Sequence, residues 1–117
     1  MTKFAIHTQV LENYGAHAED GKFASGNAYW KFKPGTTYIV SDCERLQDAV
    51  AFVMAAFSDN GIGWKEYPCH YETEGEWLAG MAGDDEEYQQ FQQETAMKVS
   101  PNYGKSTVRY KEKKEAA

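Results

Sequence analysis

The chain has 117 residues, which is enough for one domain with a single modest core. Its 42% hydrophobic and 15% aromatic content excludes a wholly disordered protein. No apolar run reaches the roughly 20 residues of a membrane span, and the N-terminus lacks the apolar stretch of a signal peptide. We therefore expect a cytoplasmic protein with no membrane partner.

The net charge of −6 is unevenly distributed. Residues 1–65 carry six basic and seven acidic side chains, residues 66–94 carry nine acidic and no basic ones, and residues 95–117 carry six basic and two acidic ones. Duplex DNA is an unfavourable partner for such a chain, because a DNA reader needs basic charge across its binding face. The acidic block instead suits a basic protein, and the basic end suits an anion.

Cysteine and histidine spacing predicts no metal or redox centre. The chain contains Cys43, Cys69, His7, His17 and His70, with no C-x-x-C and no H-x-x-x-H pair among them. We therefore expect reduced thiols, no metal ion and no cofactor.

The first strand is predicted from Phe4 onward, because apolar and polar side chains alternate there with the period of two of a half-buried strand. Phe4, Ile6, Thr8 and Val10 form the apolar face, and Ala5, His7 and Gln9 form the other. Asn13–Gly15 should end this strand, since Asn and Gly tolerate positive φ. Residues 16–27 then form a long loop of a kind that is often mobile or functional.

Two further strands are predicted over residues 28–33 and 36–40. Trp30 and Phe32 should face the core, and the alternating residues should face solvent. Pro34–Gly35 predicts a reversal between them, as a hairpin with a bulge or a slightly longer loop.

Three helices and a fourth strand follow. Ser41–Glu44 is a capping box that predicts the start of the first helix, which Asp59–Gly61 should end. Its apolar stripe consists of Leu46, Ala49, Val50, Val53, Met54 and Phe57. A strand over 62–67 should stop at Pro68. A second capping box at Thr73–Glu76 predicts a short second helix, and four acidic residues, Asp84–Glu87, predict the first turn of a third helix at the surface.

This order of elements predicts an α+β fold. We expect a two-layer sandwich in which an antiparallel sheet of four to five strands carries two to three helices on one face. Residues 1–104 should form one domain. Residues 105–117 should form a basic tail or, over 106–110, a short edge strand.

The uncovered sheet face and the nearby loops are the predicted binding surface. Lysines beside aromatic rings and polar groups can hold a planar anion. The face would carry His7, Gln9, Tyr29, Lys31, Lys33 and Lys65. A second set would combine the loop residues Asn13, Tyr14 and His17 with Arg109 of the tail, whose guanidinium suits a phosphate. The alternative is that these are ordinary solvated residues of a one-sided sheet and a frayed terminus.

No catalytic motif is present. The chain has no Walker loop, no G-x-G-x-x-G and no G-x-S-x-G. Cys43 would lie in the first turn of a helix, where the dipole lowers a thiol pKa, but it has no recognisable partner motif and suits a buried corner better. We therefore expect a binding protein and not an enzyme.

Four segments resemble a family of small proteins encoded by tailed bacteriophages. They are Thr8–His17, Ala28–Lys33, Ala49–Val53 and Gly61–Pro68, and the resemblance covers residues 3–98. The chain is also similar to the first family of Thoeris anti-defence proteins, which sequester a cyclic ADP-ribose signal without cleaving it. This resemblance implies a homo-oligomeric counter-defence protein in the host cytoplasm that binds a nucleotide-type anion. The second hypothesis is an inhibitor whose acidic 66–94 segment occupies a basic groove on a host defence enzyme.

Overall fold

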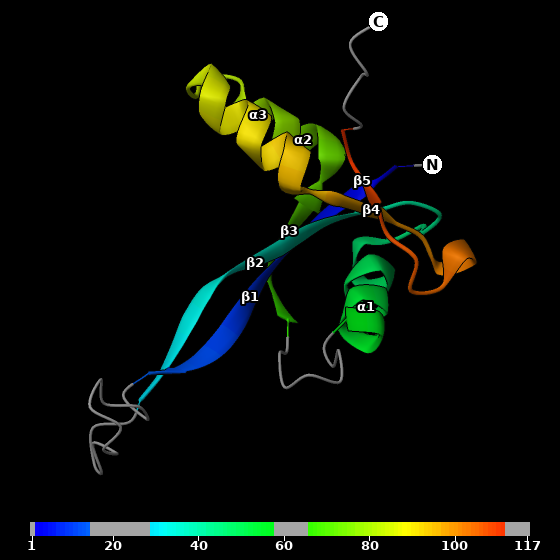
Figure 1. The fold of residues 1–117 in the computed structure, drawn as a ribbon. Helices are drawn as coiled ribbons and strands as arrows, with labels where there is room; N and C mark the ends of the chain where they lie inside the picture. The colour runs from blue at the N-terminus through cyan, green and yellow to red at the C-terminus, as the bar shows by residue number, and fades with distance from the viewer. Residues whose placement is uncertain (1, 15–28, 58–65, 112–117) are drawn as a thin grey trace, which may run out of the picture.

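The computed structural model describes residues 2–14, 29–57 and 66–111, and for 11–14 and 29–31 it describes the backbone (Figure 1). The described residues form a five-stranded sheet in the order β3-β1-β2-β4-β5. Its strands are β1 Phe4–Tyr14, β2 Tyr29–Val40, β3 Glu66–Thr73, β4 Met97–Val99 and β5 Val108–Arg109. The helices are α1 Leu46–Phe57, α2 Glu74–Met81 and α3 Glu86–Thr95, with a short 3₁₀ turn, η1, at Pro101–Tyr103.

This architecture confirms the predicted α+β class. The sheet is mixed and not purely antiparallel, because β4 pairs with β2 in the parallel direction while the other pairs are antiparallel. The parallel pair arises because the chain crosses the sheet through β3, α2 and α3 before it returns beside β2.

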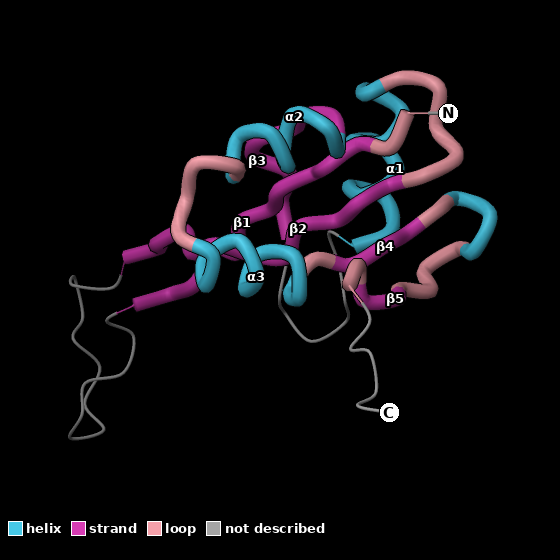
Figure 2. Tube along the Cα trace, turned by 90° about the horizontal axis from the view of Figure 1, so that it is seen from above, coloured by secondary structure: helices cyan, strands magenta, loops and turns pink. Residues whose placement is uncertain are grey.

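Apolar side chains are buried on both faces of the sheet. Figure 1 shows α1 on one side and α2 with α3 on the other, and Figure 2 shows α2 and α3 on either side of the central strands. The cluster on the α1 face contains Phe4, Ile6, Tyr38, Val40, Cys43, Ala49, Val53 and Val99. The cluster on the opposite face contains Ala5, Ile39, Trp77, Met81 and Ala96. The face predicted to be open is thus partly covered, because Ala5 and Ile39 alternate with the first cluster and are apolar themselves.

The predicted reversal at Pro34–Gly35 is wrong. β2 runs continuously through both residues and pairs with β1 along its length, with a register shift between His7 and Gln9. A bulge, and not a turn, therefore accommodates the Pro-Gly pair. Gly35 is required there, since a Cβ would lie 2.5 Å from Thr8 Oγ1 and 3.3 Å from the Thr8 carbonyl carbon.

β3 also differs from its prediction. It continues through Pro68 to Thr73, which an edge strand allows because one side of its backbone needs no sheet partner. His7 pairs with His70 and Thr8 with Pro68, so Cys69 is an extra residue in β3. Residues 62–65 of the predicted strand lie outside the described residues.

The connection into α1 is not the predicted capping box. α1 begins at Leu46, and Asp42 adopts φ 65°, a left-handed conformation that Asp tolerates better than most residues. Ser100 Oγ donates to the Asp42 carboxylate, which joins this connection to the end of β4. Met54 is 50% exposed and lies outside the apolar stripe, and the predicted stop at 59–61 lies outside the described residues.

The second capping box is confirmed. The Glu76 amide donates to Thr73 Oγ1 over 3.1 Å, and the Thr73 amide donates to the Glu76 carboxylate over 3.0 Å. α3 is a surface helix as predicted and, lying wholly within the described residues, buries none of its side chains. β5 lies within the predicted edge strand. Within the described ranges, no helix combines the length and the apolar character that crossing a membrane requires.

Candidate functional site

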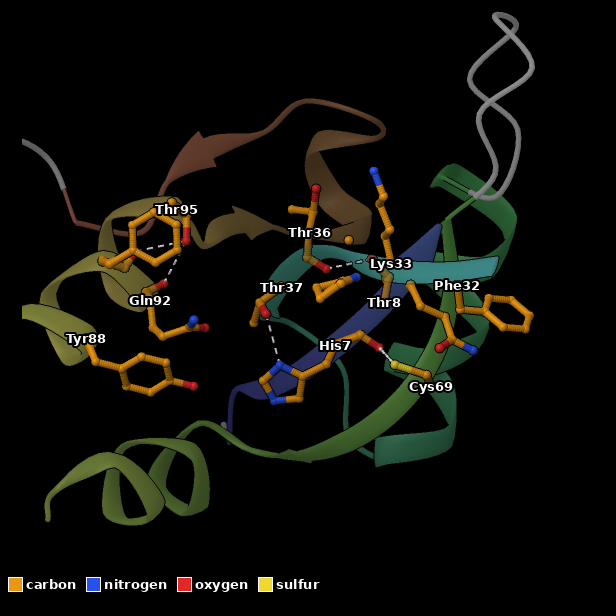
Figure 3. A pocket seen from close by; sticks show the side chains of 14 residues that line it. His7, Thr8, Phe32, Lys33, Thr36, Thr37, Cys69, Tyr88, Gln92 and Thr95 are labelled. Carbon is orange, nitrogen blue, oxygen red and sulfur yellow. Dashed lines mark hydrogen bonds between the residues drawn. The ribbon is translucent and has the colours of Figure 1, made fainter. Parts of the chain in front are cut away.

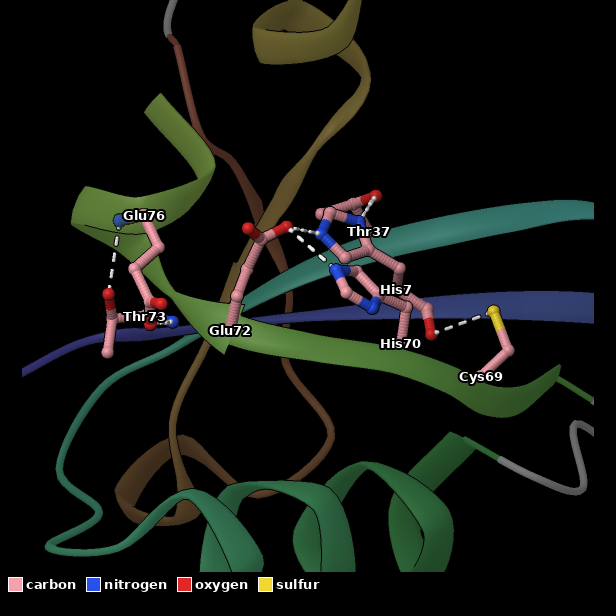
Figure 4. Close-up of polar contacts among 7 residues, drawn as sticks. All are labelled: His7, Thr37, Cys69, His70, Glu72, Thr73 and Glu76. Carbon is pink, nitrogen blue, oxygen red and sulfur yellow. Dashed lines mark hydrogen bonds and ion pairs between the residues drawn. The ribbon is translucent and has the colours of Figure 1, made fainter. Parts of the chain in front are cut away.

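His7 is the centre of a polar cluster on the α2 and α3 side of the sheet (Figure 4). Its Nδ1 lies 2.9 Å from Thr37 Oγ1, and its Nε2 lies 2.6 Å from the Glu72 carboxylate. Strand register explains the set, because His7 lies opposite Thr37 on β2 and opposite His70 on β3. Both neighbouring strands carry their extra residue just beyond His7, and such bulges turn side chains to new directions beside many binding sites.

His70 completes what we call the histidine cluster, namely His7, His70 and Glu72. The two imidazole rings are stacked with centroids 5.4 Å apart, and His70 Nε2 lies 3.5 Å from the Glu72 carboxylate. His70 and Glu72 share a face because they are two residues apart on one strand. The side chains of His7 and Glu72 are 20% and 21% exposed, whereas that of His70 is 67% exposed. The cluster is therefore fixed on its inner side and open on its outer side.

A groove of about 650 Å³ separates this part of the sheet from α3 (Figure 3). Tyr88 and Gln92 extend from α3 toward His7 and Thr37. We call this hollow the α3 groove, and its lining consists of His7, Thr8, Gln9, Phe32, Lys33, Pro34, Gly35, Thr36, Thr37, Cys69, Tyr88, Phe91, Gln92 and Thr95. Three aromatic side chains of this lining are exposed although they are large and apolar, at 51% for Phe32, 49% for Tyr88 and 60% for Phe91. The groove thus joins aromatic rings, amides, hydroxyls and a lysine in one place.

Two other hollows lie on the described surface. The α2 hollow, of about 310 Å³, borders the histidine cluster and is also lined by Trp77 and Met81 of α2. It shares His7, Tyr88 and Gln92 with the α3 groove. The terminal hollow, of about 650 Å³, lies near β4 and η1 and includes Lys3, Lys98 and Tyr103.

Three predicted ligand-binding residues meet in the α3 groove, namely His7, Gln9 and Lys33. Arg109 does not join them, because its guanidinium donates to the Glu94 carbonyl at the end of α3 over 3.0 Å. The remaining predicted residues lie outside what the structure describes: His17 and Lys65 entirely, and Asn13, Tyr14, Tyr29 and Lys31 in their side chains. The prediction that Phe32 faces the core is wrong, because its ring is exposed and lines the α3 groove.

Sequence reasoning missed Thr37, His70, Glu72 and the α3 side chains. A signal for part of the set was present, since His70-x-Glu72 has the spacing of one strand face. The predicted strand end at Pro68 excludes both residues from one strand and so conceals this signal. No local signal indicates that Tyr88 and Gln92 of α3 face His7, since only the tertiary fold brings them together.

Buried titratable groups on the other face are unsuited to catalysis. Burial, together with Asp48 and Asp42, raises the pKa of the Cys43 thiol, which is the opposite of the shift expected at a helix start. Burial and its hydrogen bond to Glu66 raise the pKa of Tyr38. Both groups are therefore held in their neutral forms, and neither lines the α3 groove.

No protein-family model, no curated protein and no solved structure matches this chain.

Proposed function

We propose that the protein is a non-catalytic binder that sequesters a nucleotide-type anion in the α3 groove. The observation that carries this proposal is the meeting of three exposed aromatic rings with Lys33 and several amide and hydroxyl side chains in one hollow of about 650 Å³. That volume lies within the range of small-molecule sites. The resemblance to phage counter-defence proteins supports the same ligand class and a homo-oligomeric sponge in the host cytoplasm.

Each part of such a ligand has a counterpart in the groove. A planar base can stack on Tyr88 or Phe91, and stacking of this kind is worth about 1–3 kcal/mol per base. The amides of Gln9 and Gln92 offer both donors and acceptors to a base edge. The ammonium of Lys33 supplies positive charge for a phosphate. The groove provides contacts for binding. Two groups with nucleophilic atoms also line it, the exposed Cys69 thiol and the Thr37 hydroxyl, which is hydrogen-bonded to His7 over 2.9 Å.

Calorimetry against cyclic nucleotides and ADP-ribose isomers tests the proposal. At least one member should bind, and Tyr88→Ala should weaken that binding by about 1–3 kcal/mol. Lys33→Gln should reduce the affinity for the same ligand, and the reduction should be greater in low salt than in high salt. The matched control is Lys98→Gln, which removes the same charge from the terminal hollow. A panel without any binder contradicts the proposal, as does a loss of affinity at Lys98 with none at Tyr88.

The second candidate function is inhibition of a basic partner protein by the acidic segment. The observation in its favour is that Asp84, Asp85, Glu86 and Glu87 are all exposed at the start of α3. Replacing the four by Asn and Gln should abolish inhibition of a host defence enzyme if they occupy its nucleic-acid groove. Unchanged inhibition would eliminate this candidate.

A further inference from the structure

We propose that the histidine cluster binds a divalent transition-metal ion through His7 Nε2, His70 Nε2 and a Glu72 carboxylate oxygen. This site shares His7 with the α3 groove, but it does not require the proposed nucleotide binding and is testable with a metal ion alone. One potential ligand atom from each of the three residues lies within 4.8 Å of the other two. They come from two paired strands, so the backbone register, and not a flexible loop, brings them together.

The distances require small adjustments on metal binding. With metal–nitrogen and metal–oxygen distances of about 2.0–2.2 Å, tetrahedral ligand atoms lie about 3.3 Å apart. His70 Nε2 and the Glu72 carboxylate are 3.5 Å apart, which already fits. His7 Nε2 and the same carboxylate are 2.6 Å apart and must separate by less than about 1 Å. His70 is exposed enough to rotate, so the site can form without movement of the sheet.

Thr37 provides the support that metal-binding histidines usually have. A ligating imidazole almost always engages its second nitrogen in a hydrogen bond that fixes the ring. His7 Nδ1 has this partner in Thr37 Oγ1. Without a metal, the Thr37 hydroxyl can donate to Nδ1 while Nε2–H donates to Glu72. With a metal on Nε2, the proton resides on Nδ1 and the same hydroxyl accepts, so one contact serves both tautomers.

The ligand chemistry selects the ion. Two imidazoles and one carboxylate suit Zn²⁺ and its neighbours in the first transition row, whereas Mg²⁺ and Ca²⁺ prefer oxygen ligands alone. Three protein ligands leave at least one coordination position open, as in catalytic and exchangeable sites and unlike closed structural sites. The α2 hollow borders the cluster on its exposed side and gives water or a ligand access to that position.

Titration of untagged, chelator-treated protein with Zn²⁺ in a calorimeter tests this inference. One ion per chain should bind, and substitution with Co²⁺ should give the visible absorption of a nitrogen–oxygen site. His70→Ala should weaken binding more than about 100-fold, since replacing a supporting residue alone costs about 10- to 100-fold. Thr37→Val should weaken Zn²⁺ binding by about 10- to 100-fold, since Thr37 is such a supporting residue. His70 is 67% exposed, so its variant retains the fold, which a circular dichroism spectrum checks.

Two controls assign the ion to the cluster. Glu72→Gln keeps the side-chain shape and should weaken binding as His70→Ala does. Cys69→Ser removes the exposed thiol that lies 3.4 Å from the His7 carbonyl oxygen and should leave the affinity unchanged. Absence of stoichiometric binding overturns the proposal. So does binding that survives both His70→Ala and Glu72→Gln, or binding that Cys69→Ser abolishes.

Discussion

The two faces of the sheet are built from the same strands and differ in what their side chains do. On the α1 face, Phe4 and Ile6 pack against Ala49 and Val53 in a continuous apolar cluster. On the opposite face, Ala5 packs against α2, but the next residue on that face of β1 is His7, which makes polar contacts. Apolar side chains therefore fill the α1 face. On the opposite face they fill the end beneath α2, and the α3 groove occupies the remainder.

This difference indicates where binding residues are to be sought on the sheet. Residues two apart on a strand share a face, so on β1 the buried Ala5 is followed on the same face by His7, which makes polar contacts. The bulges opposite His7 mark the change, and beyond them the sheet no longer carries a helix packed tightly on its second face. Stability should accordingly depend on the two apolar clusters, and binding on the hollow end of the second face.

The largest expected effect is at Ile6, whose side chain is fully buried on the α1 face. Ile6→Ala should lower the free energy of unfolding by about 2–5 kcal/mol, because it removes apolar contacts and leaves a cavity. Urea denaturation followed by circular dichroism measures it. The matched variant is Phe91→Ala in the α3 groove, which should change stability by less than about 0.5 kcal/mol because the ring is 60% exposed. Equal effects would remove the distinction between the faces.

An intermediate effect on stability is expected at Gly35, in the bulge of β2 opposite His7 and Gln9. Gly35→Ala should destabilise the fold by about 1–3 kcal/mol, because the added methyl group meets Thr8 at the close contact described above. It should also weaken Zn²⁺ binding, because a displaced Thr8 would shift its neighbour His7 on β1. The control is Gly80→Ala in α2, where an added Cβ has nothing within 4 Å and should stabilise by about 0.5–1 kcal/mol. A neutral Gly35→Ala would show that the bulge relaxes freely.

The sequence predicted the elements whose signals are local. Alternation identified β1, the capping box at Thr73 identified α2, and the apolar stripe identified most of α1. It failed at Pro34–Gly35 and Pro68, where residues that usually interrupt strands are accommodated by a bulge and by an edge position. Propensity is a property of the segment, whereas these outcomes depend on the neighbouring strand.

The candidate site was only partly predictable for the same reason. His7, Gln9 and Lys33 follow from alternation within their own strands. Glu72 becomes their neighbour only through the pairing of β1 with β3, which joins residues 65 apart in the sequence. Such a pair has no spacing that a motif can express.

The smallest expected effect is a pH dependence at the start of α2. Hydrogen bonds from Thr73 lower the pKa of the Glu76 carboxyl below its ordinary value. A lowered folded-state pKa stabilises the fold above the unfolded pKa of about 4.3, and this contribution is lost as the pH falls through the folded value. Glu76→Gln should therefore reduce the loss of stability in acid, as measured by urea unfolding at neutral and acidic pH. Glu44→Gln, an exposed carboxylate outside the helices, is the control, and an equal change in both variants would contradict this assignment.

The shallow attachment of α3 has a consequence for the dynamics of the groove. α3 buries none of its described side chains, and the Arg109 guanidinium holds its last turn. Amide hydrogens in such an element exchange through local opening, at a lower free energy than the unfolding of the sheet. The wall of the groove can thus move while β1 and β2 stay paired. A ligand that bridges α3 and the sheet would slow exchange in residues 86–95 and leave the exchange of the core strands unchanged.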